Sequence, residues 1–128
     1  MDTGRPRVVG SRQRVIPSGP GTPGMLREVA FAGEDRWVGF VRTEPGVRSG
    51  WHHHGDTDTY FYVLHGAMEL EFGPGGHERL AVGAGDFAHV PAGLVHREGT
   101  PADEPAEIVL VRIGHGQPVV NVEGPEPG

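Results

Sequence analysis

Short apolar runs, rich in β-branched and aromatic residues, recur through the middle of the chain, and clusters of Gly, Pro and Asp separate them. Runs of about four to eight such residues between turn residues are typical of β-strands, and no stretch has a helical period over roughly ten residues. The pattern predicts strands at about residues 26–31, 37–43, 49–54, 59–64, 67–72, 78–82, 86–90, 95–98 and 107–113. Short strands at this spacing indicate an all-β fold, either a sandwich or a barrel.

The two ends of the chain lack this pattern. Residues 1–24 carry arginines among Gly, Pro and Ser, and residues 114–128 hold Gly, Pro and Glu around one short apolar stretch. Because 128 residues suit one domain, we expect a single barrel over residues 25–113, with a partly ordered N-terminal arm before it and a C-terminal tail after it. We expect the arm to lie along the barrel or along a neighbouring subunit.

Composition removes several function classes. The chain has no cysteine, which excludes disulfides and thiolate nucleophiles. All 11 basic residues are arginine, which excludes a Schiff-base lysine and a phosphate-binding P-loop. A formal net charge of -6 argues against nucleic acid as a partner. No run approaches the roughly 20 apolar residues of a membrane span, and the N-terminus lacks the apolar stretch of a secretory signal. We therefore expect a cytoplasmic protein that does not bind membranes.

Histidines are the candidate metal ligands, because the chain has 8 of them and three are adjacent in sequence. In a strand, His52 and His54 lie on one face and His53 on the other. Imidazoles two residues apart on a strand are about 7 Å apart at the backbone, close enough for both rings to reach one ion. Imidazole suits Fe(II), Ni, Cu, Co, Mn and Zn, and a further ligand has to come from elsewhere in the fold. The alternative is an exposed loop in which none of the three is a ligand.

Two segments around these histidines resemble the characteristic motifs of the cupin family. In the first motif, G-x5-H-x-H-x3-4-E-x6-G, the corresponding positions are Gly46, His52, His54, Thr59 and Gly66. In the second motif, G-x5-P-x-G-x2-H-x3-N, they are Gly85, Pro91, Gly93, His96 and Thr100. Both motifs have the family's internal spacing and order, and together they cover residues 46–100.

The resemblance implies a double-stranded β-helix, or jelly-roll, barrel of two antiparallel sheets with a metal site near one mouth. It implies that His52, His54 and His96 are metal ligands. We expect one divalent transition metal ion per chain, with Fe(II) preferred because an ion held by three histidines has open positions for substrate and dioxygen, and with Zn, Ni, Mn, Co or Cu as alternatives. It also implies a homodimer, which agrees with the tendency of exposed sheet edges to pair.

The sequence departs from the motifs at two positions, because Thr59 replaces the ligand glutamate and Thr100 replaces the final asparagine. Three neutral histidines leave the full charge of the ion uncompensated and attract an anionic ligand more strongly. Thr59 could hydrogen-bond a metal-bound water, which we prefer. Asp58 or Asp56 could instead supply a carboxylate, although Asp58 has the wrong strand parity and needs a bulge to reach the site.

Five other residues are candidates for the surroundings of the site. Phe61 is expected as a pocket wall or as plain core, and Trp51 at the mouth or in a subunit contact. Arg42 or Arg48 could hold a substrate carboxylate, since arginine pairs bidentately with anions, or either could be simply exposed. His89 could act as a base or as a polar group of the pocket.

These residues favour a metal-dependent cupin enzyme with a mononuclear three-histidine site. The preferred activity is that of a non-haem Fe(II) dioxygenase, an oxidoreductase, acting on a small, anionic, bidentate substrate. A redox-neutral Zn, Ni or Mn isomerase, lyase or cyclase is the first alternative. A non-catalytic cupin that binds a small ligand is the second, because a fold by itself does not determine function.

Overall fold

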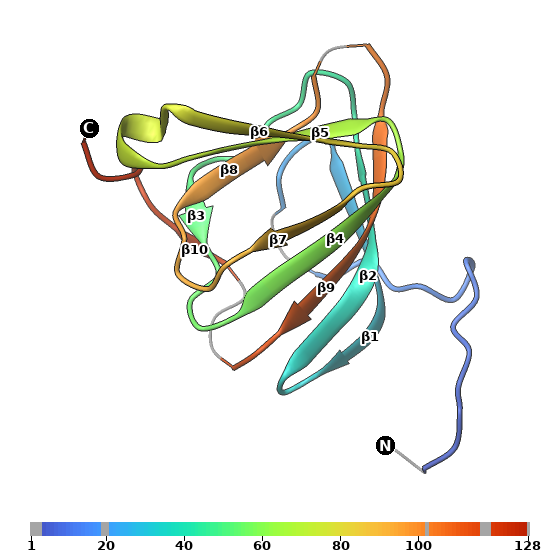
Figure 1. The fold of residues 1–128 in the computed structure, drawn as a ribbon. Coiled ribbons are helices and arrows are strands. Elements are labelled where there is room, and N and C mark those ends of the chain that lie inside the picture. Colours follow the sequence, from blue (N-terminus) through green and yellow to red (C-terminus); the bar gives the residue numbers. More distant parts are fainter. Residues whose placement is uncertain (1–3, 19–20, 102, 116–118, 128) are drawn as a thin grey trace.

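The structure is a computed structural model, and it describes residues 4–18, 21–101, 103–115 and 119–127. In these residues the chain forms strands in two antiparallel sheets and one short 3₁₀ helix, η1 (Figure 1). The elements are β1 (Met25–Gly33), β2 (Arg36–Thr43), β3 (His52–His53), β4 (Asp58–His65), β5 (Ala67–Phe72), η1 (Pro74–Gly76), β6 (Glu78–Gly83), β7 (Phe87–Val90), β8 (His96–Gly99), β9 (Ala106–Ile113) and β10 (Val120–Asn121). The all-β class predicted from the hydrophobic pattern is confirmed.

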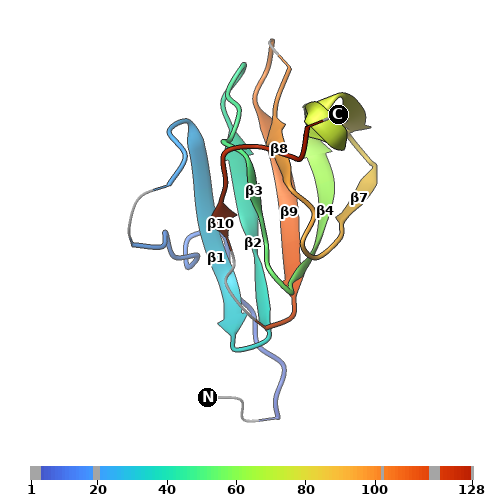
Figure 2. The same cartoon turned by 90° about the vertical axis from the view of Figure 1, so that its left-hand side faces the viewer.

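The two sheets join strands that are far apart in the sequence. One sheet has the order β1-β2-β9-β4-β7 and the other has the order β10-β3-β8-β5-β6. The sheets face each other across the interior, as Figures 1 and 2 show from two directions. Pairing of β2 and β4 with β9, and of β3 with β8, brings the two motif segments into one barrel.

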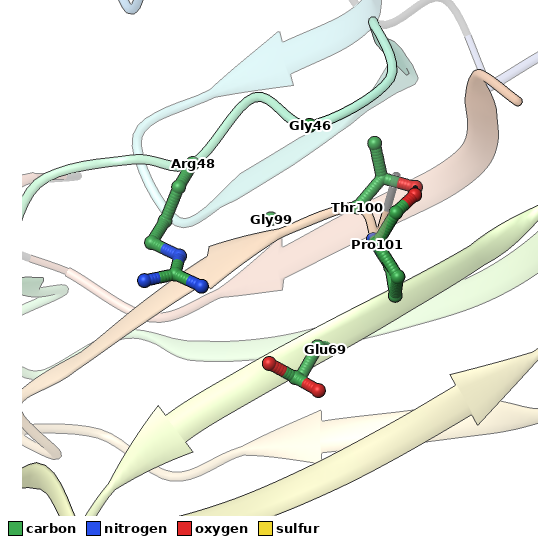
Figure 3. Close-up of a pocket in the computed structure, with 6 residues that line it drawn as sticks. All are labelled: Gly46, Arg48, Glu69, Gly99, Thr100 and Pro101. Carbon is green, nitrogen blue, oxygen red and sulfur yellow. Dashed lines mark hydrogen bonds between the residues drawn. The ribbon is translucent and has the colours of Figure 1, made fainter. Parts of the chain in front are cut away.

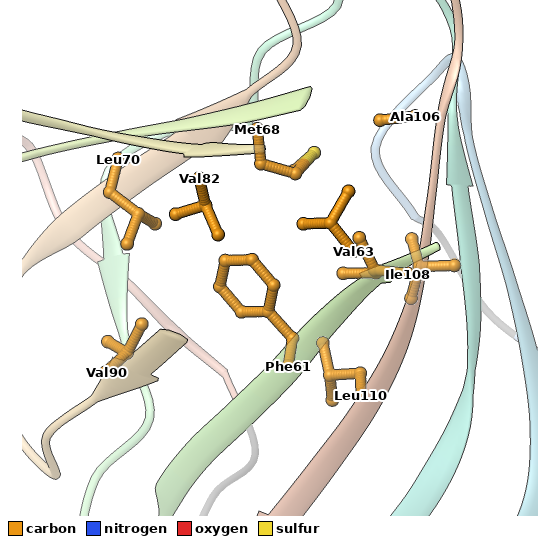
Figure 4. Close-up of a cluster of buried hydrophobic side chains, with 10 residues drawn as sticks. Phe61, Val63, Met68, Leu70, Val82, Val90, Ala106, Ile108 and Leu110 are labelled. Atoms are coloured by element: carbon orange, nitrogen blue, oxygen red, sulfur yellow. The ribbon is translucent and has the colours of Figure 1, made fainter. Parts of the chain in front are cut away.

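The core fills the space between the sheets and follows strand alternation. On β9, Ala106, Ile108 and Leu110 point inward while the residues between them face outward. Figure 4 shows these side chains meeting Phe61 and Val63 from β4, together with apolar residues of the opposite sheet. Alternating strands bury one face only. At the start of β4 and the end of β9, the inward positions are the buried polar residues Thr59 and Arg112.

Both ends of the chain add contacts to the barrel. In the predicted arm, Val15 pairs with Val29 of β1 through two backbone hydrogen bonds of 2.9 and 2.7 Å, while the first described residues extend away from the barrel (Figure 1). In the predicted tail, Val120 and Asn121 form β10 and pair with His53 and His52 of β3. Two residues are too few for a strand to be recognised from alternation, so the sequence pattern missed β10.

The predicted strand at 49–54 is shorter in the structure, where β3 contains only His52 and His53. Arg48 forms an isolated bridge with Gly99, so this segment still lies along β8 before β3 begins. Among the described residues, no helix has the length and apolar character needed to cross a membrane. The homodimer expected from the sequence stays a prediction, since the structure holds one chain.

We expect Gly66→Ala to destabilise the fold far more than Gly46→Ala, although both glycines have nearly the same positive φ, 76° and 75°. A Cβ at Gly66 would overlap the carbonyl oxygen of Pro105 and lie 3.0 Å from the Cα of Ala106, whereas a Cβ at Gly46 meets nothing within 4 Å. Gly46→Ala should therefore cost only the backbone strain, about 1–2 kcal/mol, and Gly66→Ala about 3 kcal/mol or more. Urea unfolding of both variants measures the difference, and equal losses would contradict the steric argument.

Candidate metal centre

Three histidines meet at the polar end of the interior. His52 belongs to β3, His54 follows directly after β3, and His96 begins β8, where it pairs opposite His52. All three residues are buried, with 4%, 3% and 2% of their surface exposed. Their ring centroids are 4.5 to 5.1 Å apart, and one ring nitrogen from each lies within 4.8 Å of the others. The structure thus brings together the three histidines that the motifs indicated, in an arrangement that could hold a metal ion.

Backbone carbonyls orient two of these rings. Nδ1 of His52 is 2.8 Å from the carbonyl oxygen of Gly50, and Nδ1 of His96 is 2.9 Å from that of Leu94. A carbonyl only accepts hydrogen bonds, so each Nδ1 carries a proton and donates it. Nε2 of each ring is then directed into the cluster, where it can offer a lone pair. Histidines that bind metals commonly have this second hydrogen bond, and the donor set fits a divalent transition ion.

Glu98 adds a carboxylate to the cluster, and sequence reasoning missed it. Its Oε2 atom lies 3.2 Å from Nε2 of His96 and 3.4 Å from Nε2 of His52. Burial raises the pKa of Glu98, but its interactions with the two histidines outweigh burial and hold the pKa well below its usual range. Glu98 is therefore an anion at neutral pH. The available signal was strand alternation, since a residue two positions after His96 shares its face.

Thr59 and Arg112 face the cluster from the other sheet, where they are direct partners on β4 and β9. Both are buried, with 3% and 7% of their surface exposed. Thr59 Oγ1 and Arg112 Nε lack a hydrogen-bond partner within the described part of the chain. The guanidinium carbon of Arg112 lies 5.3 Å from the centroid of the Trp37 ring. Burial lowers the pKa of Arg112 to about 10, so the group stays charged at neutral pH.

An interior cavity of about 20 Å³, about the size of one water molecule, connects these groups. Its polar lining comes from both sheets and consists of His54, Thr59, His96, Glu98 and Arg112. Its apolar lining includes Phe61, which also belongs to the hydrophobic core. Phe61 thus has both of the positions that we considered from the sequence, pocket wall and core. The cavity places a hydroxyl and a buried cation beside the candidate metal ligands.

The structure places Asp58 and His89 away from this centre. Asp58 Oδ1 accepts hydrogen bonds from Nε2 of His89 at 2.8 Å and from the backbone N–H of Ala92 at 3.1 Å. His89 also stacks on Tyr60, with 4.6 Å between ring centroids. These groups are on the outer face of β4 and β7. Asp58 would need a bulge in β4 to turn inward, and the described register from Asp58 to Val63 is regular. Asp56 is exposed in the turn after His54.

The two arginines that we expected at the substrate are also elsewhere. Arg42 faces outward and binds Glu107 and Glu44, with N–O distances of 3.2 and 3.3 Å. Arg48 lies 3.4 Å from Glu71 and lines a surface pocket of about 220 Å³ (Figure 3). This pocket is on the outer side of its sheet, because its wall residue Glu69 alternates with the core residues of β5. Both arginines therefore lie outside the barrel interior.

Trp51 and Thr100 have structural partners. The guanidinium of Arg97 lies 4.4 Å from the Trp51 ring centroid, so Trp51 packs on the outer face of β8. Thr100 Oγ1 donates a hydrogen bond of 2.7 Å to the carbonyl oxygen of Ala67. The threonine at the last position of the second motif thus links the end of β8 to the start of β5.

Comparisons with known proteins agree with this architecture. Residues 39–112 match the family model described as the cupin domain. A double-stranded β-helix protein from Klebsiella pneumoniae is 24% identical with a TM-score of 0.72, over 93% of this chain and 99% of the other. The polyketide cyclase RemF from Streptomyces resistomycificus is 20% identical with a TM-score of 0.75, over 92% and 86% of the two chains. Oxalate decarboxylase from Bacillus subtilis is 23% identical with a TM-score of 0.66, over 80% of this chain and 28% of that enzyme.

A search of curated proteins gives no significant match. The structural similarities confirm the predicted double-stranded β-helix fold, and at these identities they indicate the fold alone. The matched family model spans more than half of the chain and includes all three histidines. The chain therefore belongs to the cupin family.

Proposed function

We propose that this chain is a metal-dependent cupin enzyme that acts on a small anionic molecule. The convergence of His52, His54 and His96 on one buried point supports this proposal. A divalent ion bound there would supply Lewis acidity, and Fe(II) would in addition supply reactivity towards dioxygen. The protein's own contribution is to hold the ligands with oriented rings and to exclude bulk water from the interior.

Arg112 supports an anionic substrate. An ionised group buried without a partner is costly, and in the described residues Arg112 has an aromatic ring beside it but no carboxylate within ion-pair distance. An anion that enters the cavity would gain charge-assisted hydrogen bonds from this guanidinium. Thr59 could donate a further hydrogen bond from its hydroxyl. Because the cavity is only the size of a water molecule, the substrate should be small, and some lining side chains should move when it binds.

Among the reactions open to such a site, we propose Fe(II)-dependent dioxygenation first. Three imidazoles suit Fe(II), and they leave positions on the ion for both a substrate and dioxygen. The redox-neutral alternative uses Zn, Ni or Mn as a Lewis acid. The neighbours illustrate that cupin folds carry different activities, since one is named a polyketide cyclase and another an oxalate decarboxylase.

Metal analysis of protein produced without a histidine tag tests the proposal. We expect close to one transition metal ion per chain, and oxygen consumption when the Fe(II)-loaded protein receives a suitable substrate. The panel should contain small carboxylates including oxalate, diketones, thiols and phenolic acids. Turnover without oxygen consumption would support the redox-neutral alternative, and stable ligand binding without turnover would support a binding protein. Failure to retain any metal would reject the metal-dependent function.

A further inference from the structure

The carboxylate that the first cupin motif lacks is present in the structure on a different strand. Thr59 occupies the motif position on β4, whereas Glu98 approaches the histidines from β8, in the opposite sheet. Resting on the metal-dependent function proposed above, we propose that Glu98 is the fourth protein ligand of the ion. The centre would then contain three histidines and one glutamate, with the glutamate supplied from a position outside the family motif.

The distances around Glu98 support this role. Its Oε2 atom faces Nε2 of both His52 and His96, at 3.4 and 3.2 Å. Two ligands that bond one ion at about 2.1 Å lie about 3.0 to 3.4 Å apart when the angle between them is about 90° to 109°. The observed separations fall within this range, so Glu98 could share an ion with His52 and His96.

The hydrogen-bonding capacity of these atoms also indicates a cation among them. Nδ1 of each ring already donates to a backbone carbonyl, so Nε2 is the ring atom that faces the carboxylate in both histidines. Glu98 Oε2 is buried and, in the described part of the structure, has no conventional hydrogen-bond partner. A proton on one ring would satisfy one of the two N–O pairs, whereas one metal ion would bond all of these atoms together.

The position of Glu98 determines where a substrate would bind. Arg112 is the buried cation of the opposite sheet, yet it forms no ion pair with Glu98 among the described residues. If the metal ion neutralises the negative charge of Glu98, the guanidinium of Arg112 remains available to bind an anion from outside. The short side chain of Thr59 leaves the cavity open next to Arg112. We therefore infer that the ligand carboxylate is contributed from the β8 side and that the substrate binds on the β4 and β9 side.

The test compares Glu98→Gln with the wild-type protein and with Glu69→Gln, a matched change on the outer face of the same sheet. Affinity for Mn(II) is measured by competition with a chelator, and the ligand field is measured from the visible absorption of the Co(II)-loaded protein. We expect Glu98→Gln to weaken Mn(II) binding on the order of 100-fold and to change the Co(II) spectrum. Glu69→Gln should leave both unchanged, and Glu98→Asp should restore part of the affinity.

The outcomes separate this inference from the proposed function. If wild-type protein binds no metal, the metal-dependent function itself fails. If the wild type and Glu98→Gln bind Mn(II) equally, with the same Co(II) spectrum, the three-histidine site stands and the role of Glu98 is rejected. Should Glu98→Gln fail to fold by circular dichroism, a crystal structure of the Mn(II)-loaded wild type decides, because a Glu98 oxygen further than about 2.6 Å from the ion would reject ligation.

Discussion

His54→Ala should abolish metal binding at physiological metal concentrations, with an affinity at least about 100-fold below that of the wild type. Removing a residue that only hydrogen-bonds a metal ligand already lowers metal affinity about 10- to 100-fold. Removing a ligand itself should lower the affinity more. His54 is buried at the centre, with its ring 5.0 and 5.1 Å from the rings of His52 and His96. Chelator competition and metal analysis of tag-free protein measure the effect, and any metal-dependent activity should disappear with the metal.

His53→Ala is the matched control for this variant. His53 is adjacent in sequence but faces the other side of β3, where its Nδ1 atom accepts a hydrogen bond of 3.0 Å from the backbone N–H of Gly55. Its removal should leave metal affinity within about twofold of the wild type, because the ring is not directed into the cluster. Equal loss in the two variants would mean that the histidine run binds metal as an exposed tract, and this would contradict the buried centre.

Arg112→Met should weaken anion binding about 10- to 100-fold while leaving the fold as stable or more stable. A hydrogen bond to a charged group contributes about 1.5–3 kcal/mol, which sets the expected loss of affinity. Replacing a buried charge with an apolar side chain of similar volume is often neutral or stabilising, by about 1–4 kcal/mol. The lost interaction with Trp37, about 1–2 kcal/mol, reduces this gain. Titration of the metal-loaded protein with oxalate and thermal unfolding of the same samples measure the two effects.

Arg42→Met and Arg112→Lys are the controls for that prediction. Arg42 lies on the neighbouring strand β2, but it faces outward and binds Glu44 and Glu107, so its replacement should not affect oxalate binding. Lysine at position 112 keeps the charge but loses the planar pair of donors, and it should retain part of the affinity. Lower stability of Arg112→Met together with unchanged oxalate binding would show that Arg112 serves the fold and not a ligand.

The interior centre combines stabilising and costly elements. The apolar residues of the two sheets supply the burial that holds the barrel together. At the polar end, Glu98 and Arg112 bring opposite charges into the interior without bonding each other in the described structure. Buried charges with incomplete partners destabilise a fold and are typical of functional sites. The arrangement is explained most simply if a cation and an anion bind there together.

The sequence by itself determined the strands and three residues of the centre. Alternation and turn residues locate most strands to within a few residues, because the face of a strand is a local property of the chain. The same rule placed His53 opposite to its neighbours, and the motif spacing singled out His52, His54 and His96. Alternation also opposed Asp58 as a ligand, and the structure places this carboxylate on the outer face.

Tertiary structure alone decided which other groups face the histidines. Glu98 is next to His52 only because β3 pairs with β8, and Arg112 meets the cavity only because β9 lies between β2 and β4. Arg42 is of the same residue type and is also close to the ligand strand in sequence, yet it points away from the interior. Such neighbours are set by pairing between distant strands, which local periodicity does not encode. The chain's own pattern therefore determined the histidines, and the packing of the two sheets determined the charged groups around them.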